Sequence, residues 1–328
     1  MHLSIEKFSN KDDEKWDNFI MNNSINGTLL HSRKFLNYHK NKFSDYSLLI
    51  KKCASIVAVV PACEVVEENK RIFYSHKGST FGGIVINSVY NNISHIDSVI
   101  SILEQYLNEQ GFDKVILKNT SEIFCNDNTS LLDYFYFKYG YSSYNELSLY
   151  IDFKKYDSII ENNFSASKRR DLKYSLKYNL QFKILKTDDE VNDFYKLLVL
   201  SLTNHNTKPV HSLEELLDFK NSRLSDIVEF YGVYYKDNLI AGSMVFNFNN
   251  TVFHTQYLAS DSVYSKYYPM NFLNYNLIRE AYLNSFRFFS FGISTEKQGE
   301  ILNTSLAQFK EGFGAMSSIN RTYFKELK

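Results

Sequence analysis

Prolines and cysteines are scarce in this sequence of 328 residues, and it has no long apolar run. The three cysteines, Cys53, Cys63 and Cys125, are odd in number and lack Cys-x-x-Cys spacing, which argues against a disulfide framework. Cys53 and Cys63 lie in strand-like text and are expected to be small buried hydrophobes, as in a reducing cytoplasm. The longest apolar stretches, such as "SIVAVVPA", are too short to span a bilayer, and the first residues resemble no signal peptide. We therefore expect a cytoplasmic protein.

Net charge is also missing, because 37 basic residues balance 37 acidic ones. This balance argues against a surface that binds nucleic acid or membrane as a whole, while leaving room for a local basic patch. Hydrophobic residues make up 44% of the chain and aromatic residues 16%, which is enough for substantial cores. The length suggests two domains.

The expected elements repeat one order in both halves: helices, an antiparallel meander, then helix, strand, helix and strand. They include a helix over residues 93–109 in the first half and one around residues 302–310 in the second. In the second half the strands 227–236, 238–248 and 251–259 are joined by the turn residues "KDN" and "NN". This order is typical of an acyl-CoA N-acyltransferase (GNAT) unit. The sequence therefore predicts an α+β protein with two tandem GNAT-like lobes, residues 1–155 and 156–328, each a mixed, mainly antiparallel sheet flanked by helices.

Glycines gather near the C-terminus, in "FGISTEKQGEILNTSLAQFKEGFGA" (residues 291–315), with many polar residues between them. Gly292 is expected to end a buried strand, so that Ser294 and Glu296 follow at its open end. Asn303 and Lys310 are seven residues apart and share one face of the next predicted helix. A helix cap with a salt-bridged surface is the structural alternative.

Three further motifs carry candidate binding residues. In "SASKRRDLKYSLKYN" a positive stripe, Arg170, Lys173 and Lys177, indicates either a phosphate clamp or a solvated helix face. His205 and His211 flank Pro209, without further residues spaced to bind a metal, and either contact substrate or pack a loop.

Strict alternation in "FHTQYLAS" places His254 and Gln256 on one strand face and Tyr257 on the other. His254 is therefore either ligand-facing or a satisfied core residue.

The segment "SKYYPMNFLNYNLIREA" lies where a GNAT protein has the glycine-rich loop that binds pyrophosphate, yet it contains no glycine. Pro269 near the helix start is compatible with a helix N-terminus. The amides of that terminus could still meet an anion, but the usual signature for CoA is missing. This departure leaves the identity of the acyl donor open.

Together, "KRRDLKYSLKYNL", "HTQYLAS" and "FFSFGISTEKQGEILNTSLAQFKEGFGA" resemble the FemAB-like branch of the GNAT superfamily. "GTLLHSRKFLNYH", "VVPA" and "GSTFGG" are similar to the first lobe of the same group, so the resemblance covers nearly the whole chain. It implies an acyltransferase of bacterial cell-envelope or polysaccharide assembly, with acyl-CoA or aminoacyl-tRNA as donor. The acceptor it implies is an amino sugar or a lipid-linked or nucleotide-linked cell-wall precursor.

Transfer of an acyl group to an amine needs a base and donors for the tetrahedral oxyanion. Glu296 or His254 is the candidate base, and Gln256 or backbone N–H groups of residues 292–295 are the candidate oxyanion donors. A carboxylate beside His254 is expected to raise the pKa of the histidine. The substrate-binding candidates are Gln256, Tyr257, His205, His211, Ser294, Asn303, Lys310, Lys168, Arg169, Arg170 and Lys173. A catalytically inactive GNAT fold that binds a nucleotide sugar or a protein is the alternative.

Overall fold

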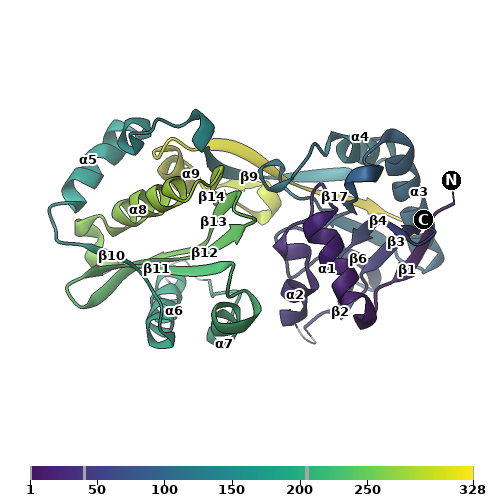
Figure 1. Ribbon diagram of the computed structural model, residues 1–328, viewed down its shortest axis with the longest axis horizontal. Coiled ribbons are helices and arrows are strands. Elements are labelled where there is room, and N and C mark those ends of the chain that lie inside the picture. Colours follow the sequence, from purple (N-terminus) through teal and green to yellow (C-terminus); the bar gives the residue numbers. More distant parts are fainter. Residues whose placement is uncertain (1, 40–41, 204–206, 328) are drawn as a thin grey trace. The chain divides into compact units, whose positions relative to one another are not determined.

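The chain forms two compact units in the computed structural model, which describes residues 2–39, 42–203 and 207–327 (Figure 1). Unit 1 comprises Met1–Glu146 and Ile319–Lys328, and unit 2 comprises Leu147–Ser318. The chain thus leaves unit 1 and returns to it with its last strand. The predicted division between residues 155 and 156 remains a prediction. It placed all of residues 156–328 in the second lobe, whereas Ile319–Lys328 belong to compact unit 1.

In unit 1, one sheet has the strand order β1-β3-β4-β7, and a second set of strands has the order β17-β8-β6-β5-β2. The bounds are β1 Ser4–Lys7, α1 Asp13–Asn22, α2 Arg33–Leu36, β2 Ser44–Asp45, β3 Leu48–Lys52, β4 Ser55–Val60, β5 Cys63–Glu67, β6 Lys70–Ser75, β7 Val85–Ile86, α3 Ile93–Glu109, β8 Lys114–Lys118, α4 Ser130–Lys138 and β17 Met316–Glu326. Most neighbouring strands are antiparallel, and β6 and β8 are parallel.

Alternation along β3 explains how helices cover both faces of the first sheet. Leu48 and Ile50 contribute to the main core together with residues of α3, while Leu49 packs with Trp16 and Phe19 of α1. Successive side chains of a strand point to opposite faces. The apolar run "LLI" therefore needs a helix on each side, and α1 and α3 supply them.

In unit 2, the strand order is β10-β11-β12-β13-β14-β9. The bounds are β9 Ser142–Asp152, α5 Ala166–Ser175, β10 Gln181–Ile184, α6 Asp188–Thr203, α7 Leu213–Asp218, β11 Val228–Tyr235, β12 Asn238–Phe248, β13 Val252–Ser260, α8 Pro269–Leu283, β14 Phe288–Ile293, β15 Thr295–Glu296, β16 Ile301–Leu302 and α9 Thr304–Glu311. Helices α5, α8 and α9 lie over one face of these strands, and α6 and α7 lie over the other (Figure 1).

Several predicted elements are confirmed closely. The helix predicted over residues 93–109 is α3, and the strand predicted over 238–248 is β12. The turn "NN" places Asn249 and Asn250 at positive φ, as a two-residue hairpin turn of type I′ requires. Both units have mixed, mainly antiparallel strands flanked by helices, so the predicted fold class is confirmed.

Other elements were missed or misjudged. The sequence analysis did not predict β6, α4 and β9. The helix predicted from Leu302 begins at Thr304, because Leu302 pairs with Thr295 in a small hairpin. Cys53 is exposed rather than buried, since it lies at positive φ in the β3–β4 turn. Cys63 is buried as expected. Within the described ranges, no helix is both long and apolar enough to cross a bilayer.

Candidate functional site

Strands β13 and β14 pair only along a short stretch and then separate within unit 2. They pair in parallel over Val252↔Phe288, Phe253↔Phe289 and His254↔Ser290, and no pairing between them continues beyond this point in the described chain. On its other side, β14 pairs with β9, with an irregularity between Ser290 and Gly292. Gly292 has φ +70°, the left-handed conformation that such a bulge favours in glycine. The polar residues of the candidate site gather where the strands separate.

His254 lies at this separation and is anchored through its ring. Its Nδ1 is 3.0 Å from Oγ of Ser290, which also accepts the N–H of Gly292 at 3.3 Å. The hydroxyl hydrogen of Ser290 is therefore available to donate to Nδ1. Burial, and then the nearby charge of Lys310, lower the pKa of His254 to about 4, against the effect of a hydrogen bond with Gln256. The imidazole is neutral at pH 7.

Lys310 brings a buried positive charge to the same place. Its Nζ donates to the carbonyl oxygens of Gly292 at 3.1 Å and Ile293 at 2.6 Å, and to Oγ of Ser294 at 2.8 Å. Burial lowers the pKa of Lys310 to about 7, whereas three oxygen acceptors favour the ammonium form. The side chain thereby fixes the end of β14 and holds Ser294 in position.

Glu296 and Asn303 continue the cluster outward. The backbone N–H of Asn303 donates to the carbonyl of Ser294 at 2.9 Å, and its side chain caps α9 by accepting from the amide of Leu306 at 3.1 Å. Its Nδ2 also donates to Oε1 of Glu296 at 3.4 Å. Glu296 lies in the exposed β15–β16 hairpin. The structure therefore brings six predicted residues together in two connected groups. Hydrogen bonds join Ser294, Glu296, Asn303 and Lys310, and another joins His254 and Gln256. The charge of Lys310 acts on His254 and so links the groups electrostatically.

Tyr257 and His211 form a separate pair. Nδ1 of His211 is 2.7 Å from the hydroxyl of Tyr257, and His211 is 6% exposed. Burial raises the pKa of Tyr257 to about 12, so its hydroxyl keeps its proton at neutral pH. The contact ties the segment before α7 to β13. His205 lies outside the described residues.

The basic residues of α5 differ in exposure and in their contacts: Lys168 is half-buried, and Arg169, Arg170 and Lys173 are exposed. Lys168 donates to Oδ1 of Asn271 at 3.1 Å and lies 3.7 Å from the ring centroid of Phe309, and burial lowers its pKa to about 8. Arg169 donates to the carbonyl of Phe164 at 2.7 Å. Arg170 and Lys173 are exposed, and Arg170 is 3.3 Å from Asp171. Lys168 and Arg169 are thus engaged within unit 2.

The predicted stripe is shorter than expected. Helix α5 ends at Ser175, so Lys177 lies beyond it instead of continuing the helical face of Arg170 and Lys173.

Alternation along β13 is also interrupted, because its register against β12 shifts between Met244 and Val245, where the β13 partners skip Gln256. A bulge inserts one residue without a partner and re-aims its neighbours. The strict alternation predicted from Phe253 to Ser260 is therefore wrong at Gln256.

Two expectations about chemistry also need correction. The pKa of His254 is lowered rather than raised, because burial and Lys310 dominate its surroundings and Glu296 lies in the exposed hairpin. Two of the amides expected to bind an oxyanion have partners: that of Gly292 donates to Ser290 and that of Ser294 donates to the carbonyl of Leu147 at 2.7 Å. The backbone N–H groups of Ile293 and Thr295 and the amide side chain of Gln256 remain the candidate oxyanion donors.

The segment between β13 and α8 contains no glycine, as the sequence shows. It forms a helical turn over Ser262–Tyr267, and Tyr268 precedes α8 at φ 54°. Pro269 opens α8 as predicted. A tyrosine therefore adopts the left-handed conformation that glycine adopts with least strain, and the helix N-terminus is kept.

Sequence reasoning missed Ser290, the partner of His254, and the residues that hold Lys168. Ser290 stands alone as a polar residue in the aromatic run "FFSFG", where a fully buried hydroxyl needs a partner. This single serine among aromatic residues was the signal from which a partner for Ser290 could have been predicted. Asn271 and Asp171, which share a hydrogen bond of 3.3 Å beside Lys168, gave no comparable signal. Across the described ranges, no three or more His, Cys, Asp or Glu side chains are grouped to hold a metal ion.

Residues 163–310 match the family described as an acetyltransferase (GNAT) domain. No curated protein matches the chain. Among solved structures, FemX has a TM-score of 0.70 at 11% identity, covering 99% of this chain and 97% of its own.

Two other solved structures also cover nearly the whole chain. The C-terminal domain of a putative lysylphosphatidylglycerol synthetase from Agrobacterium fabrum has a TM-score of 0.60 at 10% identity, covering 96% of this chain and 91% of its own. A tandem GNAT protein from the clavulanic acid biosynthesis pathway has a TM-score of 0.57 at 7% identity, covering 100% and 99%. The chain therefore has the fold of these structures, a tandem GNAT protein among them, and its residues 163–310 match the GNAT acetyltransferase family.

Proposed function

We propose that the protein transfers an acyl or aminoacyl group to an amine in the assembly of a bacterial cell envelope or polysaccharide. The observation that carries this proposal is the polar cluster at the separation of β13 and β14, inside the matched GNAT domain. The likeness to a putative lysylphosphatidylglycerol synthetase supports an aminoacyl group and a lipid-linked acceptor. The proposed acceptor is an amino sugar or a cell-wall precursor with a free amine.

In the proposed reaction, the neutral amine attacks the acyl carbonyl. An N–C bond forms, and the C–S bond of acyl-CoA or the C–O ester bond of aminoacyl-tRNA breaks. The amine loses a proton to a base, and the leaving thiolate or alkoxide takes one up. The protein must therefore supply a proton acceptor and a donor to the carbonyl oxygen.

Glu296 is the proposed base, because its carboxylate reaches solvent and its contact in the described chain is a long hydrogen bond of 3.4 Å from Asn303. His254 is the proposed positioning residue, since its contacts with Ser290 and Gln256 engage the ring. It orients Gln256, whose amide N–H groups would donate to the oxyanion. Lys310 holds the start of the segment that carries Glu296.

The donor is proposed to be acyl-CoA or aminoacyl-tRNA, both of which carry phosphates. Arg170 and Lys173 are exposed on α5 and are suited to contact them. The absence of glycine before α8 means that pyrophosphate contacts of the usual loop are not expected here. Aminoacyl-tRNA, bound by phosphates along a longer surface, depends less on such a loop.

The test is a transfer assay on the full chain with labelled acetyl-CoA or aminoacyl-tRNA and amine acceptors, read by mass spectrometry of the product. Glu296→Gln should lower kcat by about 10²–10⁴ with little change in KM, the loss expected for a general base. Glu300→Gln changes an exposed carboxylate close by in the chain and should leave kcat unchanged. Equal rates for both variants would remove Glu296 from the mechanism. Donor binding without any product would favour the non-catalytic alternative.

A further inference from the structure

Tyrosine rings gather at one end of unit 2, where α5 ends and β11 turns into β12 (Figure 1). The ring centroid of Tyr178 is 4.8 Å from that of Tyr267, which stacks on Tyr235 at 4.4 Å with an angle of 24° between planes. Tyr174 stacks on Tyr268 at 5.8 Å. The end of α5, the helical turn after β13 and the β11–β12 turn therefore share one surface. We call it the tyrosine–lysine surface, residues 173–178, 235–238 and 261–268.

Two aliphatic side chains project from this surface into solvent. Leu176 is 60% exposed and Val263 is 76% exposed. The backbone holds both in place, because the amide of Leu176 donates to the carbonyl of Leu172 at 3.0 Å and that of Val263 donates to Oδ1 of Asp261 at 2.9 Å. Exposed aliphatic side chains beside aromatic rings form the kind of apolar patch that marks an interaction site.

Lysines lie among these rings. Nζ of Lys177 is 5.0 Å from the ring centroid of Tyr174. Lys236 and Lys266 both act electrostatically on Tyr235, so their charges lie close together. Positive charge is thereby placed next to the aromatic and aliphatic side chains of the surface.

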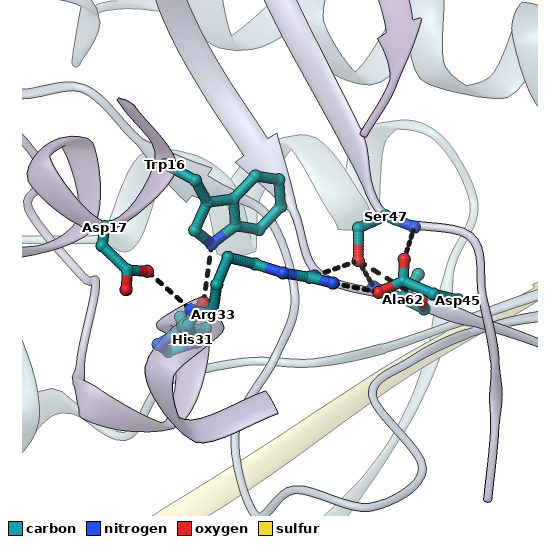
Figure 2. Close-up of polar contacts among 7 residues, drawn as sticks. All are labelled: Trp16, Asp17, His31, Arg33, Asp45, Ser47 and Ala62. Atoms are coloured by element: carbon teal, nitrogen blue, oxygen red, sulfur yellow. Dashed lines mark hydrogen bonds and ion pairs between the residues drawn. The ribbon is translucent and has the colours of Figure 1, made fainter. Parts of the chain in front are cut away.

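These lysines differ from the cation that unit 1 binds internally. There the guanidinium of Arg33 is paired with Asp45 and donates to Oγ of Ser47 at 3.1 Å (Figure 2). Within the part of the chain that the structure describes, no carboxylate pairs with the lysines of the tyrosine–lysine surface, which are Lys173, Lys177, Lys236 and Lys266.

The carboxylates of the surface do not cancel its positive charge. Its segments contain four lysines and two carboxylates, Asp237 and Asp261. Asp261 is engaged by the amide of Val263, and Asp237 is exposed in the β11–β12 turn. Asp171, which precedes the surface on α5, is paired with Arg170. The surface is therefore net positive and fits an anionic partner.

We propose that the tyrosine–lysine surface docks unit 2 on a membrane that contains anionic lipids. Leu176 and Val263 enter the upper part of the acyl chains, and the lysines meet lipid phosphates. The tyrosines lie at the level of the headgroups, where rings with a polar end are favoured. The proposal concerns the place where the protein is held, and it goes beyond acyl transfer because it needs neither Glu296 nor a particular acceptor.

Single-stranded nucleic acid is the alternative partner for an aromatic and basic surface, since bases stack on open rings. Here Tyr235 and Tyr267 stack on each other, as do Tyr174 and Tyr268, so one face of each ring is covered. Bases would also leave the exposed aliphatic carbons of Val263 without an apolar environment. A lipid surface accounts for the lysines and the aliphatic side chains together.

Sedimentation of the full chain with lipid vesicles tests the proposal. The chain should bind vesicles of phosphatidylcholine and phosphatidic acid in equal parts, and phosphatidic acid has no amine that could accept an acyl group. It should not bind phosphatidylcholine alone, and high salt should weaken binding by screening the lysines. Lys177→Gln and Lys266→Gln should each weaken binding about fivefold. Lys15→Gln, which changes an exposed lysine on α1, is the matched control and should bind as the wild type does.

The aliphatic side chains are tested separately from the charges. Leu176→Ser and Val263→Ser should each weaken binding about fivefold and keep the salt dependence of the wild type, because they remove apolar contact and leave the lysines in place. Val89→Ser is the matched control, since Val89 is 77% exposed in unit 1, and it should change nothing. Circular dichroism of all variants should match the wild type.

The proposal is overturned if the chain does not bind anionic vesicles, if it binds neutral vesicles equally well, or if the variants bind like their controls. Binding of an oligouridylate RNA without binding of vesicles would also overturn it, in favour of a nucleic-acid surface. Val263→Ser should keep full activity toward a water-soluble amine in the transfer assay. An inactive wild type that binds vesicles as expected would therefore count against acyl transfer and not against docking.

Discussion

Lys310 places a cation inside unit 2 without a carboxylate contact among the described residues. Its Nζ meets three oxygens of the segment Gly292–Ser294, two of them backbone carbonyls. Moving an ammonium out of water is costly unless its donors are satisfied. These acceptors offset part of that cost. Burial, and then the charge of Lys310, lower the pKa of His254 and keep the imidazole neutral.

Replacing Lys310 should therefore change the titration of His254. Lys310→Met removes the charge and keeps most of the volume, so the pKa of His254 should rise from about 4, because one of the two causes of its lowering is removed. NMR titration of the imidazole measures this. Lys168→Met removes a partly buried ammonium that contacts Asn271 and Phe309 instead, and should leave His254 unchanged. An unshifted His254 in Lys310→Met would show that burial alone sets its pKa.

Among the elements, the bulge at the end of β14 sets the geometry of the candidate site. Gly292→Ala forces a side chain into a left-handed backbone, at a cost of about 1 kcal/mol or more. The new Cβ would lie 3.4 Å from Cε1 of His254, an ordinary contact, so the backbone is the main source of the cost. We expect a lower midpoint of urea unfolding and lower transfer activity.

Gly140→Ala is the matched control for this change. Gly140 has φ +75°, a similar strain, and nothing lies within 4 Å of the added Cβ. It follows α4 in unit 1, so a similar loss of stability is expected without loss of transfer activity. If both variants lose activity equally, the effect of Gly292→Ala comes from stability and not from the site.

Elements with a strong local signal were predictable from sequence, and contacts between elements were not. The periodicity of residues 93–109 and the turn residues around β12 were sufficient to bound α3 and β12. Strand β9 was missed because "SSYNELSLYID" mixes polar residues into both faces. The segment 291–315 was singled out as a candidate site from its glycines and polar residues. The pairing of His254 with Ser290 depends on two strands that are far apart in sequence, so no local pattern reveals it.

At the scale of the whole molecule, three buried histidines make stability depend on pH. Burial is the first cause in each case, and it lowers the pKa of His31 and His254 to about 4 and that of His76 to about 3. Between pH 6.5 and 4 the unfolded chain binds protons at these positions and the folded chain does not. Stability should therefore fall as pH falls through this window, by about 1.4 kcal/mol per pH unit for each histidine at most.

Urea unfolding at pH 7 and pH 5 measures this slope. His254→Gln should reduce the slope, because one proton-binding difference between the two states is removed. His2→Gln, at an exposed position, should leave the slope unchanged. A slope that is the same in wild type and His254→Gln would show that His254 is not buried in its neutral form.

The return of β17 to unit 1 has a consequence for the order of events during synthesis. Thr322–Glu326 pair with Lys118–Lys114 of β8, yet the ribosome makes all of Leu147–Ser318 between the two parts of unit 1. At 5–20 residues per second, this delay is roughly 10 to 35 s. Until then, the edge of β8 that receives β17 has no partner from it, and an open strand edge invites pairing with another chain. Nascent chains arrested before Ile319 should show a protease-resistant unit 2 beside a sensitive unit 1; resistance of both would mean that unit 1 folds without its final strand.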